Sequence, residues 1–200
     1  MLNELIRNLR PADFRTSHAV FRLPSPGHAR DTLLITCSDL AINPFALIPT
    51  KPQHLYVLQN AGNLVALPPP ECHGQTDIEA AVALHQISDI VVCGHSQCGV
   101  METMLAASDV GLPRSLSRGL RSAQKTMRIV AACCGGLTGK GLSSEAARIN
   151  ILVQLANLRA IPSIVSQLDT GTIHLHGWFY SCGKISAYDP NQAEFISLSQ

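Results

Sequence analysis

Residues 89–99 read DIVVCGHSQCG, an apolar run that leads into a glycine, a histidine and a cysteine. We predict a buried β-strand over Asp89 to Cys93, because a continuous apolar run is typical of a strand covered on both faces. His95 and Cys98 follow on a loop that enters a helix. Their spacing lets an imidazole and a thiolate reach one metal ion, and zinc accepts both donors.

Two more apolar runs predict strands that end near polar residues. Residues 32–36 stop at Cys37, and residues 54–58 lead into the turn-rich segment 60–63, which reads NAGN. Open α/β sheets place ligand sites at the carboxyl ends of their strands. We therefore expect these two strand ends to meet His95 in space, and Cys37 is the best candidate for a third metal ligand.

Helical segments separate the strands, which predicts an α/β fold with a central, mostly parallel β-sheet flanked by helices. The capping-box spacing of Thr76 and Glu79 predicts a helix from there to roughly Ile87. Further helices are expected after Cys98, over residues 115–132 and over residues 144–159, before a break at Pro162. The helix at 144–159 has the clearest apolar periodicity, with Ile149, Leu152, Val153 and Ala156 at helical spacing.

The last part of the chain predicts an antiparallel extension of the sheet. Residues 172–180 and 184–188 form a potential hairpin across the turn 181–183, which contains Cys182. His174 and His176 alternate with apolar residues, so we expect both on one strand face, toward solvent or an interface.

Bulk composition predicts one globular domain over residues 1–200, with an N-terminal helix and arm over residues 1–30. Of the 200 residues, 46% are hydrophobic and 14% are charged, and the formal net charge is +1. A near-neutral chain without a Lys/Arg-rich block argues against a nucleic-acid partner. No apolar run reaches the roughly 18 residues needed to cross a bilayer, so we expect no membrane partner and a cytoplasmic protein.

An apolar stripe on the predicted N-terminal helix could pack on its own domain or cover a neighbouring subunit. The stripe consists of Leu2, Leu5, Ile6 and Leu9.

The chain has seven cysteines, an odd set that lacks the spacing of a secreted disulfide scaffold. We expect Cys93 in the core, Cys133 and Cys134 as thiols without a second metal, and Cys72-His73 in a loop. The glycine-rich segment 135–141 is expected to be a flexible loop.

Three segments together resemble the signature of β-carbonic anhydrases, in the same order along the chain. They are Cys37-Ser38-Asp39, Asn60-Ala61-Gly62-Asn63 and residues 93–99, and the segment GWFY at 177–180 matches the family's C-terminal half. Glu145, Asn150, Ile151, Leu155, Leu158 and Pro162 match that half as well. The resemblance covers nearly the whole chain from about residue 30.

The resemblance implies a zinc enzyme that reversibly hydrates carbon dioxide to bicarbonate with a zinc-bound hydroxide. It implies Cys37, His95 and Cys98 as zinc ligands, with water or the carboxylate of Asp39 in the fourth position. Family members are dimers or assemblies of dimers, so a homodimer is expected. The residues expected to shape the pocket without binding zinc are Gln59, Asn60, Gly62, Asn63 and Gly99.

One departure from the family pattern concerns the catalytic Asp39. The family reads C-x-D-x-R, whereas Ala41 occupies the arginine position here, and Gln59 stands where the family has a second arginine. Without an arginine partner, Asp39 either swings onto the zinc or stays beside it as a hydrogen-bond acceptor for bound water. Three functions follow: a carbonic anhydrase with a modified site, a zinc hydrolase of carbonyl sulfide or carbon disulfide, or a catalytically silent zinc-binding relative.

Overall fold

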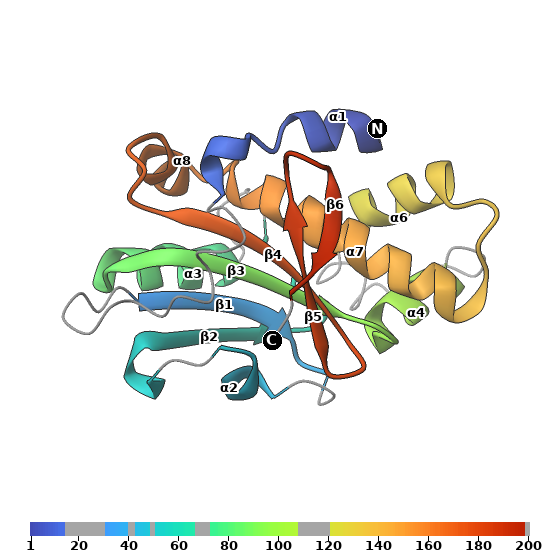
Figure 1. Ribbon diagram of the computed structural model, residues 1–200, viewed down its shortest axis with the longest axis horizontal. Helices are drawn as coiled ribbons and strands as arrows, with labels where there is room; N and C mark the ends of the chain where they lie inside the picture. The colour runs from blue at the N-terminus through green and yellow to red at the C-terminus, as the bar shows by residue number, and fades with distance from the viewer. Residues whose placement is uncertain (15–30, 40–42, 49–50, 67–72, 108–120, 199–200) are drawn as a thin grey trace.

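The computed structural model describes residues 1–14, 31–39, 43–48, 51–66, 73–107 and 121–198. Its centre is a six-stranded sheet in the order β2-β1-β3-β4-β5-β6 (Figure 1). The strands are β1 (Asp31–Cys37), β2 (Leu55–Asn60), β3 (Ile87–His95), β4 (His174–Ser181), β5 (Lys184–Asp189) and β6 (Glu194–Ser197).

The first four strands in the sheet are parallel, and the C-terminal ones are antiparallel. β1 pairs in parallel with β2 and β3, and β3 with β4, while β5 and β6 add antiparallel neighbours. This arrangement confirms the predicted mixed α/β fold, including the hairpin with Cys182 in its turn between β4 and β5. The strand β6 was not predicted.

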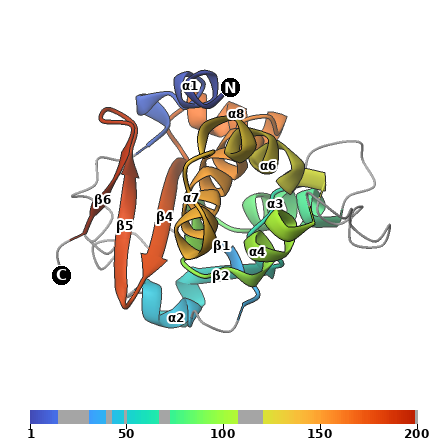
Figure 2. The same cartoon turned by 90° about the vertical axis from the view of Figure 1, so that its right-hand side faces the viewer.

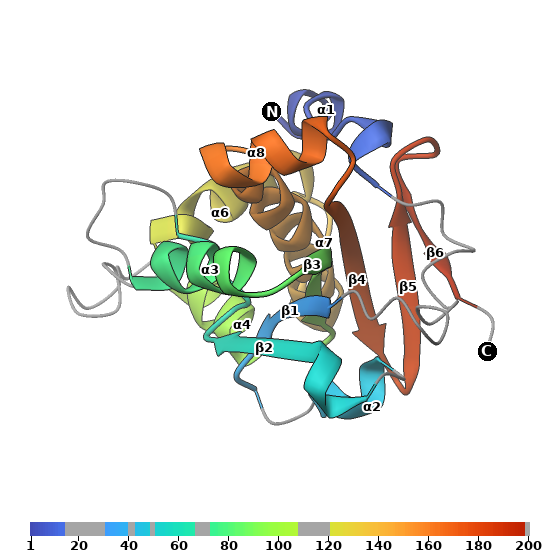
Figure 3. The same ribbon diagram turned by 90° about the vertical axis from the view of Figure 1, so that its left-hand side faces the viewer.

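Helices flank the sheet, and most gather on one side of it (Figure 3). They are α1 (Leu2–Arg7), α2 (Pro44–Leu47), α3 (His73–Leu84), α4 (Gly99–Ala106), α6 (Arg121–Cys133), α7 (Gly139–Leu158) and α8 (Pro162–Asp169). Short 3₁₀ turns cover Pro11–Asp13 and Pro52–His54. Figure 2 shows α7 lying between β4 and α6, and α7 contacts β3 as well.

Two apolar clusters lie on opposite faces of the sheet. On the α7 side, Leu33, Ile90 and Leu175 from three neighbouring strands pack in the same cluster as Ile151 and Leu155 of α7, all fully buried. The other face carries a smaller cluster that includes Leu34, Val91, Cys93 and Trp178. Side chains on successive residues of a strand point to opposite faces, so these continuous apolar runs supply both clusters.

Several predicted boundaries were wrong. The helix α3 begins at His73, so Thr76 lies inside its first turn instead of capping it, and the helix ends at Leu84 before β3 begins at Ile87. His73 is therefore helical and not in a loop, whereas its neighbour Cys72 lies outside the described residues. The spacing of Thr76 and Glu79 carries no information about residues 73–75, which are already helical.

The start of α7 also differs from its prediction. The helix begins at Gly139, whose φ is +55°, so the end of the glycine-rich segment 135–141 is helical. Glycine adopts this left-handed conformation at little cost and allows the chain to turn into the helix. The predicted helix over 115–132 corresponds to α6, and residues 115–120 lie outside the described residues. The expected break at Pro162 is confirmed: α7 ends at Leu158, and Pro162 is the first residue of α8, which is bent by 87° from α7.

The N-terminal helix packs on its own chain. Leu5 and Leu9 are 3% and 2% exposed, and α1 contacts α7. The helix ends at Arg7, and Pro11 begins the 3₁₀ turn that follows. The rest of the predicted arm, residues 15–30, lies outside the described residues.

No single helix in the described parts of the chain is long and apolar enough to cross a membrane. The helices α7 and α8 pass that test only as a pair, which is bent by 87°.

Candidate metal centre

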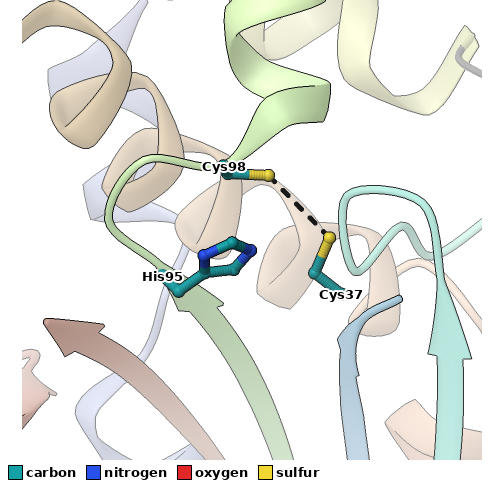
Figure 4. A group of neighbouring side chains, drawn as sticks. All are labelled: Cys37, His95 and Cys98. Atoms are coloured by element: carbon teal, nitrogen blue, oxygen red, sulfur yellow. Dashed lines mark hydrogen bonds between the residues drawn. The ribbon is translucent and has the colours of Figure 1, made fainter. Parts of the chain in front are cut away.

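Three of the predicted site residues come together where parallel strands end. Cys37 is the last residue of β1, His95 is the last residue of the neighbouring β3, and Cys98 immediately precedes α4. The three side chains point toward one another (Figure 4). Each residue is at most 1% exposed, so the group is buried.

The spacing of the ligand atoms fits one metal ion. The two sulfurs lie 3.8 Å apart, and all three ligand atoms lie within 4.8 Å of one another. Two thiolates on a tetrahedral zinc, with Zn–S bonds of about 2.3 Å, are also separated by about 3.8 Å. A disulfide would require a sulfur separation of about 2.05 Å, so these cysteines are a reduced pair.

The tautomer of His95 is the one a metal ligand needs. Its Nδ1 lies 2.9 Å from the backbone oxygen of Ser96. A carbonyl oxygen can only accept, so Nδ1 carries the proton and Nε2 keeps a free lone pair. That Nε2 is buried and has no hydrogen-bond partner among the described residues. A buried nitrogen lone pair facing two sulfurs fits a metal ion, with the Ser96 carbonyl fixing the imidazole.

The local hydrogen bonds favour a thiolate at Cys37. The pKa of Cys37 is lowered to about 4, first by the hydrogen bond from the Cys98 thiol, then by the adjacent His95 imidazole and by backbone N–H groups of Asp39 and Gly62, against the opposing effect of burial. The pKa of Cys98 is raised, because its thiol donates that hydrogen bond and is itself buried. Burial lowers the pKa of His95, but contact with the Cys37 thiolate produces a net rise.

Asp39 lies beside the cluster. Its Oδ2 is 3.8 Å from Nε2 of His95 and 3.4 Å from the backbone nitrogen of Gly99, the first residue of α4. Asp39 does not belong to the group of ligand atoms that lie within 4.8 Å of one another, so its carboxylate lies beside the candidate metal site. Ala41, which replaces the family arginine, lies outside the described residues.

The loop after β2 shapes one wall of the site. Gly62 has a φ of +79°, and its N–H donates to Sγ of Cys37 over 3.3 Å. A side chain at Gly62 would also crowd Val100 and Met101 of α4. The side chain of Asn60 closes the loop through hydrogen bonds to the N–H and the carbonyl of Leu64.

The other residues expected to shape the pocket differ in position. Asn63 is buried with a φ of 46°, and its Nδ2 has no partner among the described residues. Gly99 donates its N–H to Asp39. Gln59 lies in β2 and is exposed.

The sequence pattern identified Asn150 only as a match to the family and did not reveal the row of buried amides on α7. Asn150, Gln154 and Asn157 are at most 2% exposed and form hydrogen bonds to the loop after β2, at Gly62 and Val65. Their signal is a spacing of four and three residues, which places polar side chains on one face of an otherwise apolar helix. The apolar periodicity of the same helix identified a face that does not contain these amides.

The remaining histidines and cysteines of the described segments lie outside this cluster. His176 is 4% exposed and pairs with Asp89 at 2.9 Å, so its predicted solvent or interface position is wrong for this chain. Cys93 is fully buried, and burial raises its pKa to about 12. Cys133 is exposed and Cys134 is buried. Cys133 and Cys134 belong to no group of potential ligands within the described residues.

Known proteins share both the sequence and the fold. The pattern of the carbonic anhydrase family matches residues 32–186. The chain is 34% identical over 190 residues to a carbonic anhydrase of Pseudomonas aeruginosa, covering 90% of this chain and 83% of that protein. It is 35% identical over 192 residues to carbonic anhydrase 1 of Escherichia coli O157:H7, covering 93% and 86%.

The solved structure of the β-carbonic anhydrase CcaA superposes with a TM-score of 0.79 and 32% identity, covering 86% of this chain and 85% of that one. Tetrameric β-carbonic anhydrases from Sordaria macrospora share the fold, with a TM-score of 0.68, 24% identity and coverage of 87% and 83%. The family match, the sequence identity and the parallel sheet ending in a Cys-His-Cys cluster agree, and the chain is a member of the β-carbonic anhydrase family.

Proposed function

We propose that this protein reversibly hydrates carbon dioxide with a zinc ion held by Cys37, His95 and Cys98. The observation that carries the proposal is the buried Cys-His-Cys cluster, whose sulfur separation of 3.8 Å suits tetrahedral zinc. Zinc at this place would lower the pKa of a bound water toward about 7 and so supply a hydroxide near neutral pH. The relatives from Pseudomonas aeruginosa and Escherichia coli, both named carbonic anhydrases, support this activity.

The residues of the chain supply orientation and charge. The Ser96 carbonyl holds the imidazole of His95, and the N–H of Gly62 donates to the sulfur of Cys37. Asp39 is the group placed to accept a proton or a hydrogen bond beside the metal, since its Oδ2 lies 3.8 Å from Nε2 of His95. The N–H of Gly99 at the start of α4 takes over part of the role of the missing arginine by donating to that carboxylate.

A zinc measurement tests the ligand set. Cys98→Ser is expected to lose most bound zinc, because serine replaces a thiolate with a neutral hydroxyl. Cys182→Ser is the matched control, since Cys182 is exposed in the β4–β5 turn. Elemental analysis after gel filtration should find zinc near one per chain in the wild type and the control. Full zinc in Cys98→Ser contradicts the assignment.

Stopped-flow hydration of carbon dioxide tests the reaction, on protein of verified zinc content between about pH 6.5 and 9. A rate above buffer that rises with pH supports an open site in which Asp39 stays off the metal. Full zinc without hydration contradicts the proposal, and sulfide release from carbonyl sulfide or carbon disulfide then identifies the hydrolase alternative. A chain inactive on all three substrates is a zinc-binding relative without catalysis.

The missing arginine has its own test. If the C-x-D-x-R pairing limits activity, Ala41→Arg should raise the hydration rate by holding Asp39 away from zinc. An unchanged rate means that another group already performs this task.

We also propose that the chain forms one domain and works in the cytoplasm as a homodimer or an assembly of dimers. The tetrameric proteins from Sordaria macrospora that share this fold support an assembly. Analytical ultracentrifugation tests the assembly, and a sedimenting monomer at micromolar concentration contradicts it.

A further inference from the structure

The loop that contacts Cys37 is itself held by α7. Residues 61–65 follow β2, and Gly62 in this loop is bound from both sides. Its N–H donates to Sγ of Cys37 over 3.3 Å, and its carbonyl accepts from Nδ2 of Asn150 over 2.8 Å. Asn150 is fully buried, so no bulk water competes for this hydrogen bond.

The orientation of the Asn150 amide is unambiguous. Its Oδ1 accepts from Oγ1 of Thr126 and from Nε2 of Gln154, both over 2.9 Å. The Gly62 carbonyl can only accept, so a flipped amide would oppose two oxygens and lose the donors on the other side. The network therefore presents one N–H to Gly62 and no alternative group.

A second link holds the loop farther along. Val65 donates its N–H to Oε1 of Gln154 and accepts from Nδ2 of Asn157 over 2.9 Å and 3.1 Å. Among the described residues, this link forms no hydrogen bond to Cys37, His95 or Cys98, whereas the Asn150 link ends on the residue that donates to Cys37. The two links are joined through Gln154, which accepts from Asn157 and donates to Asn150. Asn157 therefore holds the loop at Val65, whereas Asn150 binds the Gly62 carbonyl directly. Comparing the two shows whether the orientation of the Gly62 peptide matters beyond holding the loop.

Stability alone gives a poor reason for the Asn150 amide. A buried hydrogen-bonded amide gains little net free energy over apolar packing, although its loss here would leave the Gly62 carbonyl without that donor. A peptide N–H that donates to a metal-binding sulfur has a functional role, because hydrogen bonds to the metal ligands orient them and change the affinity for the metal.

We propose that Asn150 is a positioning residue for the metal site, which holds the Gly62 peptide so that its N–H donates to the Cys37 sulfur. The inference rests on the proposed role of Cys37 as a zinc ligand. It adds an outer contact to the site, supplied by α7 through the loop after β2.

Asn150→Leu and Asn157→Leu form a matched pair, because the substitution, the helix and the burial are the same. Both variants lose loop hydrogen bonds, so both should unfold at lower temperature. Asn150→Leu is expected to bind zinc about 10- to 100-fold more weakly, measured by competition with a chromophoric chelator, while Asn157→Leu stays within about twofold of the wild type. Equal zinc affinities in the two folded variants overturn the proposal.

Cobalt and cadmium provide readouts that do not depend on activity. The thiolate-to-cobalt absorption band should shift in Asn150→Leu and keep its wild-type position in Asn157→Leu. An unshifted band in folded Asn150→Leu overturns the proposal. In the wild type loaded with ¹¹³Cd, the Gly62 amide proton should show a scalar coupling to the metal across the N–H···S bond. This measurement needs no variant, and its absence from a well-resolved Gly62 amide signal overturns the proposal even if Asn150→Leu fails to fold.

These outcomes are distinct from a failure of the proposed function. A wild type that binds no zinc refutes the ligand set itself. A wild type that binds zinc but does not hydrate carbon dioxide refutes the activity and leaves the role of Asn150 to be decided by the metal measurements.

Discussion

Gly177→Ala tests the close approach of α7 to the sheet. A Cβ at Gly177 in β4 would lie 2.9 Å from Cδ1 of Leu155, 3.0 Å from Cγ2 of Ile151 and 3.3 Å from Cβ of Tyr188. Ordinary carbon contacts are about 3.5–4.0 Å, so the added methyl overlaps two side chains of α7 and one of β5. Neither side can yield freely, because all three residues belong to the same core cluster.

The expected loss of stability follows from this overlap. Overpacking of a core costs about 1–3 kcal/mol, and the lower entropy of an unfolded alanine returns about 0.4–1 kcal/mol. A net loss of about 1–2 kcal/mol corresponds to a decrease in Tm of roughly 2–8 °C for a chain of this size. The protein should be loaded with zinc to the same extent in each sample, so that metal loss does not contribute.

Gly135→Ala is the control. A Cβ there meets no atom of the described residues within 4 Å, so its free energy of unfolding should change by less than about 0.5 kcal/mol. Urea unfolding followed by circular dichroism gives both values. If Gly177→Ala unfolds at the same urea concentration as Gly135→Ala, the tight packing of α7 on β4 is refuted.

The reactive thiols and one buried hydroxyl give two further predictions. Iodoacetamide should label the exposed Cys133 and Cys182 in the zinc-loaded protein, and Cys37 and Cys98 only after a chelator is added, as peptide mass spectrometry can show. Labelling of the last two with zinc bound contradicts their role as ligands. Tyr188→Phe should leave stability at pH 7 unchanged or raise it, because the buried hydroxyl has no partner among the described residues. Burial, followed by the nearby charge of Asp189, raises the pKa of Tyr188 to about 12 from an ordinary value of about 10. The unfolded chain therefore ionises first, and the wild type should lose stability as the pH rises from about 10 to about 12, whereas the variant lacks this loss. Urea midpoints with the same pH dependence in both proteins contradict the prediction.

Local sequence patterns predicted five of the six strands and the resemblance to the family. The apolar runs of β1 and β3 were predicted to within two residues at each end, because parallel strands buried on both faces leave a continuous signal. The placement of Cys37 and His95 together followed from one topological rule, that neighbouring parallel strands end at the same edge. Helix starts were less predictable, as at Thr76 and Gly139, because caps and glycines act within one turn and several nearby residues can begin a helix.

Only the tertiary structure decided how the site is supported. Sequence spacing could not show that Nε2 of His95 has no hydrogen-bond partner in the part of the chain that the structure describes, since this depends on which atoms surround a buried ring. It could not show that Asn150 reaches Gly62, because the two residues are 88 positions apart and meet through the packing of α7 beside the loop after β2. Backbone preferences and apolar periodicity are local and can be read along the chain, whereas hydrogen bonds between distant side chains exist only once the core has closed around them.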